Sequence, residues 1–231
     1  MGMALLTLYV ALASPLDELA ERMLSAHMTQ HLLLMLAAAP LLVWSKPVPY
    51  LIWAFPLPLR RAAAHLWNRY GLAKTIHLIE RPAICWAAFC GVIILWHVPA
   101  VYRWAMASEV RHVLMHLSFL GAGLLFWSVV LEPSGRRRLG YAPAALFVLS
   151  AALLTGLPGA LIAFAQQPLY QGGMSLPNPF GLSALADQQL AGLIMWIPMD
   201  LILFGVAIAL FGLALARPSP TIGITRHRHA A

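Results

Sequence analysis

The sequence AHMTQHLLLMLAAAPLLVW, residues 26–44, has no charged side chain and is long enough to cross a membrane as a single helix. A helix that spans the hydrocarbon core needs about 20 mainly apolar residues. Similar apolar runs follow at residues 82–98, 112–131, 141–165 and 188–215. The chain is therefore predicted to be all-α, a polytopic transmembrane helix bundle.

The composition supports a membrane protein and argues against a soluble one. Of the 231 residues, 61% are hydrophobic and only 10% are charged, with a mean hydropathy of +0.78. A soluble domain of this composition would leave large apolar patches in water. The net charge of +7 comes mostly from short loops, which the positive-inside rule explains. We expect the lipid bilayer as a partner and no nucleic acid.

Residues 1–13 form a sixth apolar run that is only about half as long as a spanning helix needs to be. The triplet Ala11-Leu12-Ala13 resembles a signal-peptidase site, but no basic residue precedes it. We favour a short or truncated first span over a cleaved signal. The prediction is about six spans.

Basic residues predict the orientation. If the N-terminus lies inside, Arg22, Arg103 and Arg111 fall on the outer side. The other twelve basic residues fall inside: Lys46, Arg60, Arg61, Arg69, Lys74, Arg81, Arg136, Arg137, Arg138, Arg217, Arg226 and Arg228. Basic residues near span ends hold loops in the cytoplasm, so both termini are predicted to lie inside.

The chain is predicted to form one transmembrane domain, residues 1–216, followed by a basic cytoplasmic tail, residues 217–231. A long cytoplasmic loop, residues 45–81, contains LRRAAAHLWNRYG, which mixes basic and apolar residues as an interfacial helix does. His65 and His77 lie in this loop and are interpreted as surface residues.

Five histidines lie at the predicted outer ends of the spans: His27, His31, His97, His112 and His116. Two pairs are spaced four apart, which places both imidazoles of a pair on one face of a helix. Polar side chains inside membranes are expensive and usually functional. Five histidines from three helices therefore predict a metal site near the outer surface.

Methionines accompany these histidines and bear on the metal's identity. Met28 and Met35 share a span with His27, and Met115 adjoins His116. Met195 and Met199 form a further pair spaced four apart. Imidazole suits copper, zinc and iron, whereas thioether sulfur selects Cu(I), so copper as Cu(I) is the predicted cofactor. The alternative is that the methionines are core residues and the histidines reach the headgroups.

Three carboxylates complete the candidate site. Glu109 lies three residues before His112, where it either orients the imidazole or is an exposed acid at the end of a loop. Asp187 opens the last span and is interpreted as its acidic N-cap. Asp200 falls about 20 Å further along that helix, near mid-membrane, which implies a partner or a functional role.

Several spaced blocks carry a family resemblance: ALASPLDELAERMLSAHMTQHLLLMLAAAPLL, ILWHVPAVYRWA, RHVLMHLSFLGAGLLFW, PLY and ADQQLAGLIMWIP. In this order they resemble the CtaG family of bacterial cytochrome c oxidase assembly factors, whose members have a longer N-terminus. The resemblance implies a multi-pass protein of the bacterial plasma (inner) membrane. The orientation predicted from the basic residues makes the metal site face the periplasm or cell exterior. The resemblance also implies an oxidase subunit as partner and a role in supplying copper to the catalytic subunit.

Catalytic motifs are missing from the sequence. It has no HExxH, GxSxG, Walker A or CxxCH pattern, so we predict a non-enzymatic copper-binding assembly factor. Two alternatives stay open. One is a membrane b-type cytochrome in which two histidines ligate haem, and the other is a metal-free scaffold for oxidase assembly.

Overall fold

The computed structural model describes residues 1–131, 139–170 and 178–216, and every regular element in these ranges is helical. The elements are α1 Gly2–Leu12, α2 Pro15–Ala20, α3 Leu24–Leu32, the π-helix η1 Leu33–Ala38, α4 Ala39–Ser45, α5 Pro47–Ala54, α6 Leu57–Arg69, α7 Leu72–Ile79, α8 Pro82–Trp96, α9 Pro99–Met106, α10 Glu109–Leu131, α11 Tyr141–Ala163 and α12 Ala184–Ala216. The predicted all-α class is confirmed.

Five segments of the described chain are long and apolar enough to cross a membrane: Gly2–Ala20, Leu24–Ser45, Glu109–Leu131, Tyr141–Ala163 and Ala184–Ala216. The pair α7 and α8, which is bent by 65°, is a sixth candidate if the two helices count as one span. The first segment differs from the sequence prediction, because α2 continues the apolar run after α1 and lengthens it to 19 residues. The predicted polytopic bundle of about six spans is confirmed.

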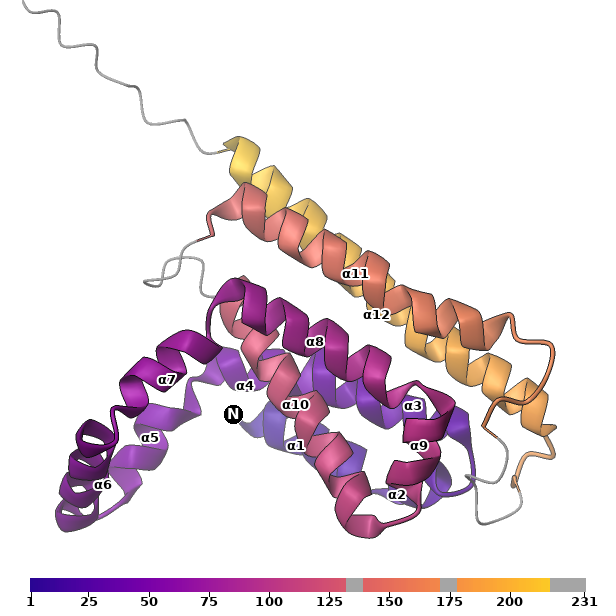
Figure 1. The fold of residues 1–231 in the computed structure, drawn as a ribbon, viewed down its shortest axis with the longest axis horizontal. Coiled ribbons are helices and arrows are strands. Elements are labelled where there is room, and N and C mark those ends of the chain that lie inside the picture. Colours follow the sequence, from indigo (N-terminus) through magenta and orange to yellow (C-terminus); the bar gives the residue numbers. More distant parts are fainter. Residues whose placement is uncertain (132–138, 171–177, 217–231) are drawn as a thin grey trace, which may run out of the picture.

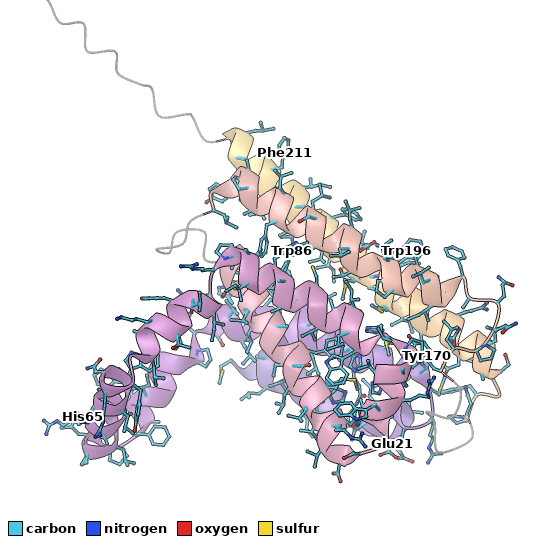
Figure 2. The ribbon with its side chains drawn as sticks, viewed as in Figure 1. Glu21, His65, Trp86, Tyr170, Trp196 and Phe211 are labelled. Atoms are coloured by element: carbon cyan, nitrogen blue, oxygen red, sulfur yellow. The ribbon has the colours of Figure 1, made fainter. Side chains whose placement is uncertain are left out.

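Helices α11 and α12 lie side by side along the bundle (Figure 1). Small residues allow this close approach. A Cβ atom added to Gly192 would lie 2.7 Å from the carbonyl oxygen of Gly159, closer than real side chains approach. On the other side of the bundle α10 packs against α8 and α4. The indole of Trp86 on α8 donates a 3.1 Å hydrogen bond to Ser150 on α11 (Figure 2).

The second span contains one turn of π-helix, and Pro40 explains its place. Within η1 the N–H of Ala39 bonds to the carbonyl of Leu34, five residues back. The next such bond would join Pro40 to Met35, but proline has no N–H. The carbonyl of Met35 instead accepts a 2.7 Å hydrogen bond from the Trp127 indole on α10. The backbone at Met35 is thereby tied to a neighbouring span.

Helices α5, α6 and α7 form an arm that projects from the bundle beside the N-terminus (Figure 1). No residue of α6 or α7 is buried. His65 lies on this arm (Figure 2), and both His65 and His77 are exposed, as predicted. The arm lies at the end of the bundle where α1 begins and α12 ends. The position of this end in the cytoplasm stays a prediction. The predicted basic tail, residues 217–231, lies outside the described ranges.

Candidate metal centre

The opposite end of the bundle is built around α3, whose N-terminus is held by a side chain from far along the chain. Asp187 on α12 accepts hydrogen bonds from the backbone N–H groups of Leu24 and Ser25, at 2.7 and 3.2 Å, and from the Ser25 hydroxyl. The carboxylate satisfies N–H groups that a helix start leaves unpaired. This contact sets the position of α3 and of the two histidines that it carries.

The interpretation of Asp187 as the N-cap of its own helix is wrong. Helix α12 begins at Ala184, earlier than predicted, and the hydroxyl of Ser183 accepts the N–H of Ala186 at 3.1 Å. Ser183 is therefore the cap, and Asp187 lies within the first turn. Its carboxylate is free to cap a different helix.

Helices α3 and α10 bring four histidines together. His27 stacks on His112 with ring centroids 5.0 Å apart, and its centroid lies 5.6 Å from that of His116. The pairs spaced four apart are also close, at 4.3 Å for His27 and His31 and 4.4 Å for His112 and His116. The predicted pairing on single helix faces is confirmed, and packing joins the two pairs.

Three of these side chains have the geometry of a metal site. One ring nitrogen each from His27, His112 and His116 lies within 4.8 Å of the others. His27 is fully buried, and His116 is 9% exposed. We call this set the histidine triad.

Most of the ring nitrogens in this cluster have no hydrogen-bond partner among the described residues. The unpartnered atoms are both nitrogens of His27, both of His31, Nε2 of His112 and Nε2 of His116. A buried polar group without a partner costs about 1–3 kcal/mol, and folded proteins rarely tolerate several together. A bound metal ion would take up the free lone pairs.

His97 approaches the cluster from the end of α8, with its ring centroid 6.2 Å from that of His31. Its Nδ1 bonds to the Ile93 carbonyl at 2.6 Å, and its Nε2 faces the Met28 sulfur at 3.1 Å. The Tyr170 hydroxyl donates to the His97 carbonyl at 2.6 Å. All five predicted histidines therefore gather at one place.

Two tyrosines near the cluster were not singled out from the sequence. The ring of Tyr102, on α9, lies 5.6 Å from that of His27 and 5.1 Å from that of Tyr170. Burial raises the pKa of both phenols above its ordinary value, so they stay protonated. The Tyr102 hydroxyl is buried and has no partner among the described residues. The sequence signal that could have identified Tyr102 is its position five residues after His97, in the same predicted outer segment.

The acidic residues around the cluster differ from the sequence expectation. Glu109 is exposed at the start of α10, and no described hydrogen bond joins it to His112. The carboxylates whose charges act on His112 are those of Asp17 and Glu21. Glu21 lies at the same end of the bundle as Tyr170 (Figure 2). Both acids lie in the short segment before α3, close in sequence to His27.

Asp200 has a partner, although it is not a histidine. Its Oδ2 accepts a 2.8 Å hydrogen bond from the Trp196 indole, while its Oδ1 is buried and has no partner among the described residues. The carboxylate lies against Gly156 of α11. The structure therefore places Asp200 in the contact between α11 and α12.

The methionines divide into two groups. Met28, Met35, Met195 and Met199 line a small cavity together with His31, His97, Leu32, Ile93 and Phe119. Met115 is fully buried but is not among the residues that line this cavity. The sequence grouped Met115 with the ligands because it adjoins His116, but adjacent residues on a helix point in different directions.

The fold and this centre define a multi-pass helical membrane protein with a buried histidine cluster that can hold a metal ion. The model of the family described as cytochrome c oxidase caa3 assembly factor matches residues 2–216. The chain belongs to that family, as the sequence blocks indicated. A search of curated proteins and a search of solved structures each find no match.

Proposed function

We propose that this chain binds Cu(I) at the histidine triad and delivers it to a subunit of cytochrome c oxidase during assembly. The family is one of oxidase assembly factors rather than of enzymes, so the oxidase is the implied partner. The observation that carries the proposal is the triad itself, in which three buried or partly buried imidazoles converge while both nitrogens of His27 and Nε2 of His112 and of His116 lack partners among the described residues.

The donor set fits a metal. Imidazole nitrogen binds first-row metals at about 2.0 Å, so three nitrogens around one ion lie within about 4 Å of one another. The triad nitrogens lie within 4.8 Å, and small side-chain rotations close the remaining difference. Three protein ligands leave a coordination position open. An open position suits an ion that is passed on, because the receiving ligand can bind before the others release.

The surroundings favour copper over zinc. Three histidines alone suit several divalent metals, but thioether sulfur selects Cu(I). His97 faces the Met28 sulfur at 3.1 Å, and a methionine-lined cavity adjoins the histidines. The proposed cofactor is therefore Cu(I). The predicted ligand role of Met115 is not part of this proposal.

No described feature favours the two alternative functions. A haem held by two histidines needs a cavity of several hundred Å³, whereas the cavity beside His31 and His97 measures about 10 Å³. A metal-free scaffold leaves the cost of the unpartnered imidazoles without compensation.

The proposed place of action is the outer side of the bacterial plasma membrane. The arm with Arg60, Arg61 and Arg69 lies at the end of the bundle opposite the triad. Basic segments stay in the cytoplasm. The triad then faces the periplasm or cell exterior.

A pair of alanine variants tests the function. His116→Ala removes a triad ligand, and His65→Ala removes an exposed histidine on the arm. We expect His116→Ala to accumulate in the membrane but to bind less Cu(I) in the purified protein than the wild type and to lose oxidase activity in cells, while His65→Ala keeps both at the wild-type level. Equal copper content and oxidase activity in the two variants would refute the triad as the copper site.

A further inference from the structure

We propose that this protein has a second Cu(I) position, deeper in the membrane than the triad and rich in thioether sulfur. Its ligands are Met28, His97, Met35, Met195 and Met199, and we call it the thioether position. This inference rests on the proposed copper role. Met28 lies on α3, as His27 of the triad does, but the other ligands come from elements that contribute nothing to the triad: η1, the end of α8 and the middle of α12.

The contact between His97 and Met28 carries the argument. A carbonyl oxygen only accepts hydrogen bonds, so the 2.6 Å contact with Ile93 places the proton of the ring on Nδ1. A second, charging proton in this buried setting would be costly. Nε2 therefore directs a lone pair at the Met28 sulfur, 3.1 Å away. Thioether sulfur has no proton to donate, so no hydrogen bond joins these atoms.

The Nε2 of His97 and the sulfur of Met28 each offer a lone pair, and no proton lies between them. Two such atoms are suited to ligate the same cation. An ion binds imidazole nitrogen at about 2.0 Å and sulfur at about 2.3 Å, so atoms 3.1 Å apart can both ligate one ion. A soft sulfur ligand selects Cu(I) among the common metals. The contact between His97 and Met28 therefore identifies the first two ligands.

The cavity next to this contact supplies the others. It is lined by four of the methionines and measures about 10 Å³, the space of about one water-sized sphere. A single metal ion fits, whereas a larger ligand does not. The side chains are shielded from lipid and water, since Met28, Met35, Met195 and Met199 are each at most 3% exposed.

The backbone around the thioether position is held in place. The Trp127 hydrogen bond ties the carbonyl of Met35 to α10. Met195 and Met199 are spaced four apart and so share one face of α12. Ligands held by rigid elements need little reorganisation to bind an ion.

His31 links the two positions. Its ring lies 4.3 Å from that of His27 in the triad and 6.2 Å from that of His97, and it lines the cavity. Both of its nitrogens are without partners among the described residues. A Cu(I) ion can move inward by ligand exchange, forming bonds to His31 and then to Met28 and His97 as its bonds to the triad break. The oxidation state does not change.

The test removes three of the four sulfur ligands, leaving only Met35, but keeps the shape of the core. The triple variant Met28→Leu/Met195→Leu/Met199→Leu substitutes residues of similar volume, which cores tolerate well. The matched control is Met23→Leu/Met106→Leu/Met115→Leu, which alters three methionines that do not line the cavity. Both are purified in detergent and loaded with Cu(I), and separately with Ag(I) as a redox-inert probe.

We expect the wild type and the control to bind two ions and to show sulfur ligation at the copper X-ray absorption edge. The triple variant should bind one ion, held by nitrogen only. Sulfur ligation and two ions in the triple variant would overturn the proposal, as would nitrogen-only ligation in the wild type. His112→Ala separates the two sites. If the His112→Ala variant still binds two ions, the assignment of the triad as a copper site fails. The thioether position is judged separately, because its support is the loss of one ion from the triple variant.

Discussion

Replacing Asp187 by alanine should both destabilise the protein and weaken copper binding. The carboxylate is 6% exposed and holds the N–H groups of Leu24 and Ser25. Hydrogen bonds to a charged group contribute about 1.5–3 kcal/mol each, and alanine leaves both donors buried without a partner. The bond from the Ser25 hydroxyl is left out of this sum, because the hydroxyl can rotate to another acceptor. The expected loss is therefore about 3–6 kcal/mol.

The assay is thermal unfolding in detergent combined with a Cu(I) competition titration. At about 2–4 °C per kcal/mol for a chain of this size, the melting temperature should fall by about 10 °C. Helix α3 carries His27 and His31, so loosening its first turn should weaken Cu(I) binding. If about 3 kcal/mol of the loss falls on the copper-bound state, binding weakens about a hundredfold, at 1.4 kcal/mol per factor of ten. The control, Ser183→Ala, removes an exposed cap and should cost about 1 kcal/mol without affecting copper. Equal melting temperatures for the two variants would refute the reasoning.

Three further predictions concern packing and orientation. Trp127→Phe leaves the Met35 carbonyl unpartnered, which should cost about 1–3 kcal/mol in unfolding measurements; an unchanged melting temperature would contradict the role of the indole. Gly192→Val should separate α11 from α12 and lower both accumulation in the membrane and the melting temperature, whereas Gly205→Val, where an added Cβ atom meets nothing within 4 Å, should be tolerated. A reporter active only in the periplasm should be inactive when fused after Ala231, and an active fusion would reverse the predicted orientation.

The spans could be predicted from the sequence because hydrophobicity and length are local properties. The run at residues 26–44 became Leu24–Ser45, and the run at residues 112–131 became Glu109–Leu131. The four-residue spacing of His112 and His116 likewise required only helical geometry to place both rings on one face. The first span was underestimated because α2 continues it beyond the Ser14-Pro15 break.

The composition of the site could not be predicted in full, since it depends on which helices pack together. Asp187 caps a helix that lies 163 residues earlier in the chain, and His97 faces a methionine 69 residues earlier. Local sequence explained Asp187 as a cap for its own helix and Met115 as a ligand beside His116. The interpretation of Asp187 took no account of the direction in which its side chain leaves the helix, and the ligand role of Met115 stays a prediction.

The apolar runs, the basic loops and the histidine pairs belong to short stretches of chain, where helical periodicity and the membrane's preference for apolar side chains act directly. The triad arises where side chains of α3 and α10 meet, and the methionine-lined cavity arises where α3, η1, α8, α10 and α12 meet. Their distances depend on side chains that meet across helix interfaces, and no pattern along one helix specifies such a meeting. The chain thus carries its membrane architecture in local sequence, while the relation between its two proposed copper positions comes from packing.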